Sequence, residues 1–404
     1  MLKDIDSEMK RKAIEAIIVL GDTTLANPDL AYAVGRSLAR GGIYFKRVSS
    51  EPLLLTSLLD VHNARKGRVK TVSTFTDYGY EKLIVEHGQA EAYPRLILKV
   101  LTQLGVAGKV VIAGRNDLAW GTHLIDRLRT LGVSVSGESS PTILEVARGT
   151  KSTDEIHEIR EVGNKTTKVV DKVLDKLKSA KHKRGHLLLG GEVATVGAMK
   201  RIISTQLAIE ELTAPEGTIF AIGASSADPH NSGVPAAEIK ERKLMVFDIF
   251  PQSESGYWFD LTRTFVVGRA DRRSRVLYNA VQAAQDAALN VLREGLPAQS
   301  AMSEACDVIE KHGFRTVRDI YNGKAQKISS GFIHSLGHGV GLTIGERPYL
   351  SLQSKDSLKT GNVVTVEPGV YIPKFGGVRI EDTVHITAKG CETLSNTRKE
   401  FELN

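Results

Sequence analysis

The sequence predicts two domains, an α/β N-terminal domain over residues 1–145 and an α+β domain over residues 150–404. Three observations predict this organisation. The chain has 404 residues, which is longer than a single hydrophobic core usually grows, about 250–300 residues. Short apolar runs alternate with helical apolar spacing in the first part of the chain. A capping box, Ser152 with Glu155, then opens a stretch of longer helices.

The elements expected in the first domain are short. Strands are expected where apolar residues run between glycine or polar residues, at 14–20, 43–48, 53–56, 69–75, 110–113 and 133–136. Helices are expected where apolar residues recur every three to four positions, at 58–66, 93–104 and 119–131. The histidines of this domain are scattered, so it contains no cluster of ligand-type residues.

The elements expected in the second domain are longer. The capping box opens a helix that runs to about residue 178, and a second helix covers 196–212. Strands are expected at 218–222, 244–249, 257–267, 363–371 and 378–386. Two long helices are expected at 274–293 and 300–312, with Ser274 and Ser300 as their N-caps.

Composition excludes several classes of protein. The chain is 41% hydrophobic and 25% charged, the balance of an ordinary globular protein. No apolar run approaches the roughly 18 residues of a membrane span. Cys306 and Cys391 are too few and too far apart for a disulfide framework. We therefore expect a cytoplasmic protein with no membrane partner.

The net charge of +7 raises the question of a nucleic-acid partner. Basic residues gather between residues 172 and 184, but no aromatic side chain lies among them, as a single-strand binder requires. Cations also suit the C-terminal end of a helix, where the helix dipole is negative. We interpret this stretch as a solvated helix end and expect no nucleic-acid partner.

Five metal-ligand side chains lie in the second domain, namely Asp248, Asp260, His338, Glu367 and Glu381. Four carboxylates and one imidazole suit divalent ions such as Mn²⁺, Co²⁺ or Zn²⁺. One ion would rarely use four acidic ligands, whereas two ions about 3.5–4 Å apart need carboxylates to bridge them. Burying these carboxylates together without metal would be costly, because like charges repel in a low dielectric. The set predicts a metal-assisted hydrolase.

Each of these five residues stands in a longer motif. In chain order the motifs are FDI at 247–249, GYWFDLTRTF at 256–265, HSLGHGVG at 334–341, VEPGVY at 366–371 and VRIEDT at 378–383. Together they resemble the pita-bread metallopeptidases, and within that group the Xaa-Pro peptidases prolidase and aminopeptidase P. The resemblance covers roughly residues 155–400. It implies a creatinase/aminopeptidase-like pita-bread catalytic domain after an N-terminal domain of the creatinase/prolidase type.

The resemblance also implies a role for each metal ligand. Asp248 would hold the first ion, and Asp260 would bridge both ions. His338 and Glu367 would hold the second ion, and Glu381 would bridge again. The implied cofactors are two divalent metal ions, manganese or cobalt, with zinc as a further option. They would give a bridging hydroxide near neutral pH and polarise the scissile carbonyl.

Three residues are candidates for a catalytic role beyond holding metal. His230 matches a family histidine that lines the pocket near the leaving side of the substrate. His334, four residues before the metal histidine, is expected to stabilise the pocket or to donate to the substrate. Glu367 is a catalytic candidate as well as a ligand.

Two further residues are expected to support the ligands. Thr262 is expected to orient Asp260, and Arg379 is expected to pair with a ligand carboxylate. Gly376 and Gly377, which precede this arginine, suggest a tight approach of the backbone.

The implied substrate is a small peptide with proline after the scissile bond, and the family often forms homodimers. A dipeptidase needs a cation for the C-terminal carboxylate, whereas an aminopeptidase leaves that side open. Prolidases usually supply an arginine for this purpose. Here Tyr349 stands at the expected position and Arg347 lies two positions away. Both activities therefore stay open.

The chain departs from the family pattern at two places. Phe250 replaces a usual glycine, and the first two aspartates are one residue further apart than usual. More seriously, Gly345 replaces the second histidine that usually follows the metal histidine by seven positions. In the family that histidine would donate a hydrogen bond during the reaction, and losing one donor of this kind typically costs roughly 10²–10³ in rate. The alternative function is therefore a pita-bread binding protein with weak or no catalysis.

Overall fold

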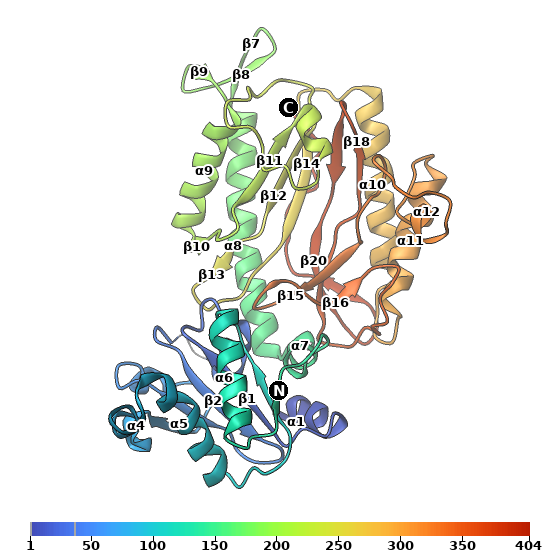
Figure 1. Cartoon of the computed structure of the whole chain (residues 1–404). Helices are drawn as coiled ribbons and strands as arrows, with labels where there is room; N and C mark the ends of the chain where they lie inside the picture. Colours follow the sequence, from blue (N-terminus) through green and yellow to red (C-terminus); the bar gives the residue numbers. More distant parts are fainter. Residues whose placement is uncertain (1, 36–37) are drawn as a thin grey trace. The chain divides into compact units, whose positions relative to one another are not determined.

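The computed structural model describes residues 2–35 and 38–404, which divide into two compact units (Figure 1). The first unit ends at Arg148 and the second begins at Gly149. One hydrophobic cluster lies wholly in the first unit, and two others lie wholly in the second. In the part of the chain described here, no helix is long and apolar enough to cross a membrane.

A six-stranded sheet, in the order β4-β3-β2-β1-β5-β6, forms the centre of the first unit. β2 runs antiparallel to its two neighbours, and the other pairs are parallel. The strands are β1 (Ala16–Gly21), β2 (Gly42–Arg47), β3 (Leu53–Thr56), β4 (Thr71–Thr74), β5 (Val110–Ala113) and β6 (Val135–Ser136). The helices are α1 (Leu2–Arg11), α2 (Pro28–Val34), α3 (Val61–Ala64), η1 (Thr76–Tyr78), α4 (Tyr80–His87), α5 (Gln89–Gln103), α6 (Leu118–Thr130) and α7 (Ile143–Gly149).

The six strands expected in this unit are all present, each within two residues of its expected bounds. The helix expected at 58–66 is only the single turn of α3. Helices α1, α2, α4 and α7 are not expected from the sequence. α4 has no fully buried residue; only Tyr80 and Leu83 pack against the core, partly buried, which is too short an apolar pattern to reveal a helix.

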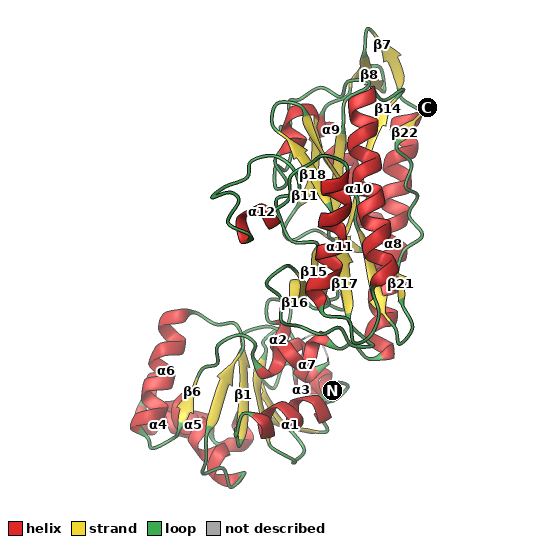
Figure 2. Ribbon diagram, turned by 90° about the vertical axis from the view of Figure 1, so that its right-hand side faces the viewer, coloured by secondary structure: helices red, strands yellow, loops and turns green. Residues whose placement is uncertain are grey.

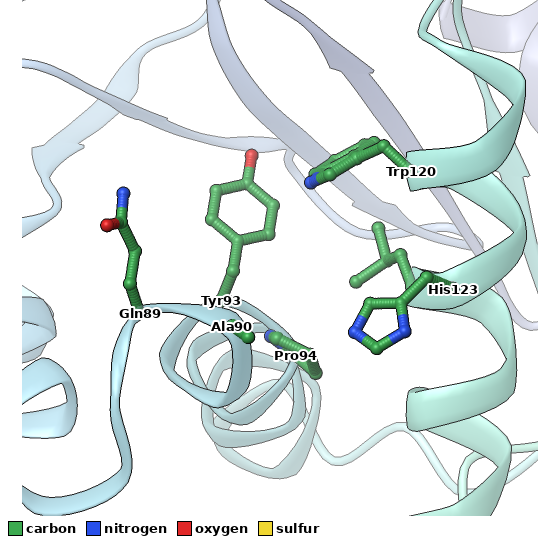
Figure 3. Close-up of a pocket in the computed structure, with 7 residues that line it drawn as sticks. Gln89, Ala90, Tyr93, Pro94, Trp120 and His123 are labelled. Carbon is green, nitrogen blue, oxygen red and sulfur yellow. The ribbon is translucent and has the colours of Figure 1, made fainter.

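Aromatic side chains meet between α5 and α6 of the first unit (Figure 3). The rings of Tyr93 and Trp120 lie 5.5 Å apart with an interplanar angle of 68°. Tyr80 lies 6.2 Å from Tyr93 on the other side, and Phe75 lies 5.8 Å from Tyr80. The four rings form a row of edge-to-face and tilted contacts, which aromatic rings prefer to flat stacking.

Two larger sheets, mainly antiparallel, build the second unit, in the orders β11-β12-β14-β22 and β16-β15-β17-β20-β21. Its strands are β7 (Lys181–Lys183), β8 (His186–Leu189), β9 (Glu192–Val193), β10 (Leu212–Thr213), β11 (Thr218–Ile222), β12 (Met245–Ile249), β13 (Gln252–Ser253), β14 (Leu261–Val267), β15 (Gly337–Val340), β16 (Ile344–Leu350), β17 (Val363–Val366), β18 (Gly369–Ile372), β19 (Gly376–Arg379), β20 (Asp382–Ile386), β21 (Cys391–Thr393) and β22 (Glu402–Leu403). Its helices are α8 (Thr153–Lys178), α9 (Val196–Ile209), η2 (Gly223–Ala227), α10 (Arg272–Val291), α11 (Ala298–Lys311) and α12 (Arg318–Tyr321).

Helices cover the two sheets separately. α8 and α9 share one hydrophobic cluster with the four-stranded sheet, and α10 and α11 share another with the five-stranded sheet. Figure 2 shows α8, α10 and α11 together along one side of the strands. The basic residues between 172 and 184 lie at the largely exposed end of α8 and on β7.

Two strands expected to be continuous are broken in the structure. The run 363–371 divides into β17 and β18, and the run 378–386 divides into β19 and β20. Pro368, which lacks an N–H for the ladder, explains the first break. Glu367 lies in the first break and Glu381 lies in the second. The interruptions therefore fall at two candidate metal ligands.

Helix and strand starts also differ from expectation. β14 begins at Leu261 and not at residue 257. The N-cap of α10 is Asp271, whose carboxylate accepts a hydrogen bond from the backbone N–H of Ser274. The N-cap position of α11 is Pro297, three residues before Ser300. Ser274 and Ser300 are therefore not N-caps; for α10 an acidic residue upstream makes the capping bond instead.

Candidate metal centre

Strand register gathers the ligand candidates in the second unit. In the four-stranded sheet Asp248 of β12 lies opposite Thr262 of β14. Asp260 lies two residues before Thr262, so the pleat directs both side chains to one face. In the five-stranded sheet the last pair of the β17–β20 ladder is Val366 with Asp382. Glu367 follows the first of these residues, and Glu381 precedes the second. These two glutamates therefore face each other at the end of the ladder.

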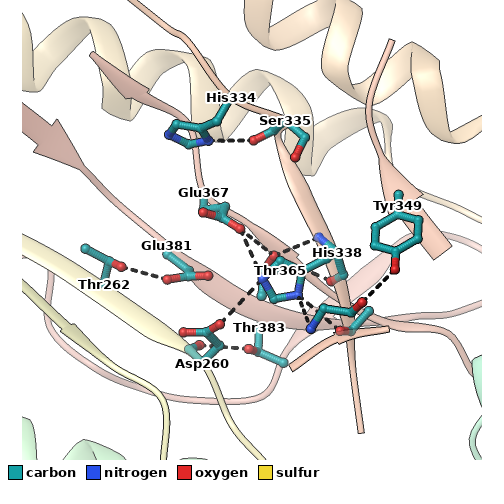
Figure 4. Close-up of polar contacts among 12 residues, drawn as sticks. Asp260, Thr262, His334, Ser335, His338, Tyr349, Thr365, Glu367, Glu381 and Thr383 are labelled. Atoms are coloured by element: carbon teal, nitrogen blue, oxygen red, sulfur yellow. Dashed lines mark hydrogen bonds and ion pairs between the residues drawn. The ribbon is translucent and has the colours of Figure 1, made fainter. Parts of the chain in front are cut away.

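The two sheets meet at these residues (Figure 4). The backbone N–H of Glu381 donates to the carbonyl of Thr262 at 3.0 Å. Ligand atoms of Asp260, His338 and Glu381 lie within 4.8 Å of one another. Nε2 of His338 lies 3.6 Å from Oδ2 of Asp260 and 3.4 Å from Oε1 of Glu367. The seam between the sheets thus brings together four of the five predicted ligands in direct proximity.

These carboxylates are buried at a high electrostatic cost. Asp248, Asp260 and Glu381 are only 7%, 4% and 2% exposed. Burial raises the pKa of Asp260 and of Glu381 well above their usual values, and neighbouring carboxylates raise both further. Burial also raises the pKa of Glu367 to about 7, against the opposing effect of Arg379. Such groups favour either a proton or a nearby cation.

Two buried oxygen atoms of the candidate ligands have no hydrogen-bond partner among the described residues. They are Oδ1 of Asp248 and Oδ1 of Asp260. Leaving a buried carboxylate oxygen without a partner is costly. Hard oxygen ligands of this kind are those that divalent ions such as Mn²⁺ accept, and an imidazole beside them broadens the choice to Co²⁺ and Zn²⁺. The residues present therefore fit divalent metal ions.

Arg379 crosses the seam and binds three side chains. Its Nη2 donates to Oδ2 of Asp248 at 2.5 Å, its Nη1 to the phenol of Tyr371 at 2.9 Å, and its Nε to Oγ1 of Thr262 at 3.2 Å. Burial alone would lower the pKa of this guanidinium, but Tyr371 and the surrounding carboxylates raise it well above its usual value. As expected from the sequence, Arg379 pairs with a candidate ligand carboxylate.

The expectation that Thr262 orients Asp260 is wrong. The hydroxyl of Thr262 donates to Oε2 of Glu381 at 2.7 Å. Its position opposite Asp248 in the ladder directs it to the seam, where Glu381 enters from the other sheet. Asp260 is held through its backbone, because the hydroxyl of Thr383 donates to its carbonyl at 2.8 Å.

A buried glutamine, which the sequence analysis missed, positions two of the ligands. Gln285 on α10 is fully buried. Its amide donates to the carbonyl of Val366 at 2.9 Å and to that of Ile380 at 3.1 Å. These residues directly precede Glu367 and Glu381. A fully buried glutamine on the inner face of a helix is unusual, and its position on that face is the signal that could have revealed it.

His334 belongs to a chain of hydrogen bonds beside the seam. Nδ1 lies 2.8 Å from the carbonyl of Ser335, which can only accept, so Nδ1 donates. Burial, followed by the charge of Arg379, lowers the pKa of His334 to about 3, so the ring is neutral and Nε2 accepts from Tyr371 at 2.9 Å. Tyr371, another residue that the sequence analysis missed, ends the VEPGVY motif. His230 is exposed on the loop after η2, close enough to influence the pKa of His334.

The backbone around Gly345 holds the imidazole of His338. The N–H of Gly345 lies 3.2 Å from Nδ1 of His338, and the carbonyl of Gly339 lies 3.1 Å from the same atom. Gly345 has a φ of 76°, and a Cβ there would meet no atom within 4 Å. Tyr349 donates to the carbonyl of Gly345 at 2.7 Å. The position of the missing histidine is therefore open but has a backbone that favours glycine.

Known proteins resemble this chain in sequence and in fold. A sequence profile of metallopeptidase family M24 matches residues 157–388. An Xaa-Pro dipeptidase of Pyrococcus furiosus is 41% identical over 184 residues, which cover 46% of this chain and 48% of that relative. The prolidase structure from Pyrococcus furiosus superposes with a TM-score of 0.72 at 26% identity, over 97% of this chain and 99% of that one. An Xaa-Pro dipeptidase structure from Bacillus anthracis gives a TM-score of 0.77 at 23% identity, over 99% and 98% of the two chains, and shows the fold alone.

The chain spans about half the length of the curated relatives that it matches first. The M24 profile nevertheless covers more than half of this chain and includes all five predicted ligands. The structural neighbours extend over both units. They confirm the predicted fold class, an α/β domain followed by a pita-bread domain. The family predicted from the motifs is confirmed as well: this chain belongs to metallopeptidase family M24.

Proposed function

We propose that this chain hydrolyses the peptide bond before proline in small peptides. The observation that carries the proposal is the complete set of four carboxylates and one imidazole around one seam in an M24 chain. The choice of proline is supported by relatives that are Xaa-Pro dipeptidases.

We further propose that two divalent ions, Mn²⁺ or Co²⁺ with Zn²⁺ as a further option, bind at Asp248, Asp260, His338, Glu367 and Glu381. Bound there, they would activate a water molecule near neutral pH and polarise the scissile carbonyl. Asp260 and Glu381 are the best candidates to bridge the ions. They are the most buried of the ligands, and neighbouring carboxylates raise the pKa of both.

The polar groups of the chain keep the ligands oriented. One oxygen of Asp248 accepts from the guanidinium of Arg379, and the other has no partner among the described residues. Glu381 has one oxygen bound by Thr262. Glu367 accepts from the hydroxyl of Thr365 at 3.1 Å. Each of these carboxylates thus keeps a further oxygen available while its direction is fixed.

His334 and His230 differ in whether their ring nitrogens are free to bind a substrate. Both ring nitrogens of His334 are engaged within the protein, so we propose that it shapes the pocket. His230 is exposed, and within the described residues its ring makes no hydrogen bond. We therefore propose His230 as the histidine that contacts the substrate.

The aminopeptidase activity is favoured by one contact. Nη2 of Arg347 pairs with Oδ1 of Asp356 at 2.5 Å, so this arginine is already neutralised and is a poor partner for the C-terminal carboxylate of a dipeptide. The relatives that are dipeptidases favour the other activity. A non-catalytic binding protein is supported only by Gly345.

Metal content tests the ligand assignment. Metal-loaded protein should contain two ions per chain by elemental analysis, and Asp260→Asn should lose at least one because a bridging ligand is shared. Glu392→Gln is the matched control, since this carboxylate is exposed on β21, and it should retain both ions. Two ions bound by Asp260→Asn at near-wild-type affinity would sink the assignment.

Turnover of three peptides tests the substrate class. We expect cleavage of Met-Pro or Met-Pro-Gly, whose relative rates separate the dipeptidase from the aminopeptidase, and little cleavage of Met-Ala. Efficient cleavage of Met-Ala with none of the prolyl peptides would rule out this class. Metal binding without turnover of any peptide would favour the binding protein.

A further inference from the structure

The segment 395–403 lies beyond the residues that the M24 profile matches, yet it is built into the second unit. Its strand β22 runs parallel to β14. The N–H of Val266 on β14 donates to the carbonyl of Phe401 at 2.8 Å. The ring of Phe401 stacks on that of Tyr278 on α10, with 4.1 Å between the centroids. The segment is therefore attached both to the four-stranded sheet and to the helix that carries Gln285.

The side chain of Lys399 reaches inward from this segment to two buried acceptors. Its Nζ lies 2.8 Å from Oδ2 of Asp382 and donates to Oε1 of Gln285 at 2.8 Å. The side chain of Lys399 is 26% exposed, that of Asp382 is 2% exposed, and Gln285 is fully buried. Among the described residues, this ammonium is the partner of both oxygens. Its removal would leave two buried acceptors without their donor, which is costly.

Arg263 binds the same carboxylate from β14. Its Nη2 donates to Oδ1 of Asp382 at 2.7 Å, and its Nη1 donates to the carbonyl of Glu381 at 2.6 Å. It also donates to the carbonyls of Thr397 and Arg398 in the segment, at 2.9 Å and 3.1 Å. Asp382 thus has a cation at each oxygen, as a buried carboxylate requires. The same guanidinium links the segment to the backbone of Glu381.

The ammonium of Lys399 also fixes the direction in which the amide of Gln285 faces. A lysine ammonium can only donate, so Oε1 of Gln285 points towards it. The amide nitrogen then points to the two carbonyls that directly precede Glu367 and Glu381. An amide turned the other way would bring its oxygen against two carbonyl oxygens, with no donor between them. The contact with Lys399 therefore selects the orientation in which the glutamine binds the backbone beside both glutamates.

We propose that Lys399 is a positioning residue of the metal centre, which orients Glu367 and Glu381 through Gln285 and Asp382. In the described structure its ammonium binds the glutamine amide and the residue next to Glu381, so its effect on the ligands is indirect. The inference rests on the metal centre proposed above. It adds to that centre a residue from beyond the stretch that the family profile matches.

Calorimetric titration of Mn²⁺ into the metal-free full chain tests the proposal. Lys399→Met keeps an apolar stem but removes the charge and the donor. It should weaken Mn²⁺ binding about 10-fold, the lower end of what is typical for groups that orient metal ligands. Lys399→Arg keeps a cation with several donors and should restore most of the affinity. Arg398→Met is the matched control: this neighbouring side chain pairs with Asp171 and Asp175 on the surface of α8 at 3.3 Å and 3.4 Å, so its removal should leave the affinity unchanged.

Urea unfolding of the same variants with a chelator measures their stability apart from metal. Lys399→Met is expected to lose stability, because it leaves two buried acceptors without a donor, and this loss alone does not support a positioning role. If Lys399→Met does not fold, Lys399→Gln takes its place, since it keeps a donor without the charge. It too should bind Mn²⁺ more weakly than wild type does.

Wild-type Mn²⁺ affinity in Lys399→Met would limit Lys399 to a structural role and overturn the proposal, whatever the stability of the variant. An equal loss of affinity in Lys399→Met and Arg398→Met would also overturn it, because the loss of one positive charge from the segment would then explain both. So would an affinity in Lys399→Arg as low as that in Lys399→Met. A wild-type chain that binds no Mn²⁺ would overturn the metal centre itself, whereas the other three results leave the metal centre in place.

Discussion

At the scale of single residues, Gly345 combines an open space with a restrictive backbone. A Cβ has room there, because no atom lies within 4 Å of its position. A φ of 76° nevertheless disfavours any residue with a Cβ, by about 1–2 kcal/mol. A glycine in a turn therefore stands where the family has a histidine. The effect of an added imidazole and the effect of backbone strain at this position can be tested separately.

Gly345→His and Gly345→Ala form a matched pair. Both should lower the free energy of unfolding by about 1–2 kcal/mol, since both carry the same backbone strain. Only the histidine variant should raise turnover of prolyl dipeptides, because only it adds an imidazole donor. Urea unfolding and steady-state kinetics measure the two effects. Equal rates for the two variants would mean that no donor is needed at this position.

His334 gives a prediction about acid. Its pKa is about 3 in the folded chain and about 6.5 when unfolded, so between these values the unfolded chain binds a proton that the folded chain does not. Stability is therefore lost as pH falls below about 6.5, by at most about 1.4 kcal/mol per pH unit from this group. His334→Gln, neutral throughout, should lose less stability than wild type between pH 6.5 and 4.

Urea unfolding of the metal-free chain at several pH values checks this difference. Both proteins contain the same site carboxylates, so these cancel in the comparison. If the free energies of unfolding of wild type and His334→Gln fall in parallel with pH, the pKa of His334 is not lowered by burial and by the nearby Arg379.

The residues that the sequence predicted and those it missed differ in kind. Asp260 and Glu381 stand in motifs whose combination of carboxylates and an imidazole has few uses other than binding metal ions. Gln285 and Tyr371 act through ordinary hydrogen bonds to groups on other elements. A polar residue on the inner face of a helix marks Gln285 as unusual, but no local pattern names the groups that it contacts. The pairing of Thr262 with Glu381 depends on two sheets meeting, which spacing along one strand does not specify.

At the scale of elements, the breaks in the strands are what direct the ligands. Regular alternation predicted two continuous strands where the structure has four, because periodicity reports burial and not where a ladder stops. Each break leaves carbonyls outside the ladders, and α10 satisfies two of them through a single side chain. A helix on one side of the sheet thereby fixes turns that carry metal ligands.

Gln285→Leu should destabilise the chain by about 1–3 kcal/mol, because it leaves buried carbonyls without a donor. It should also weaken metal binding, since those carbonyls precede Glu367 and Glu381. Gln282→Leu, three residues earlier on the same helix and only half-buried, is the control. Urea unfolding and metal titration are the measurements. Normal metal affinity in the destabilised Gln285 variant would limit this glutamine to a purely structural role.

At the scale of the whole molecule, the two units bury separate hydrophobic clusters, and all five ligand candidates belong to the second. We therefore expect calorimetry to resolve two unfolding transitions. Adding Mn²⁺ should raise the midpoint of one only, by an amount equivalent to about 2.7 kcal/mol at a hundredfold excess over Kd. A chelator should reverse the shift. Two midpoints that move together would contradict independent unfolding of the units.

The order of the ligands along the chain also constrains when the metal centre can form during biosynthesis. Asp248 leaves the ribosome roughly 130 residues before Glu381, which at about 5–20 residues per second is an interval of some 7–26 seconds. During that interval the early aspartates have neither the imidazole nor the late glutamates beside them. The first unit, complete at Arg148, has time to fold well before. Metal uptake by the proposed centre would therefore come late in maturation, and a nascent chain that exposes only two of the five ligands would be the form most open to capture of the wrong ion.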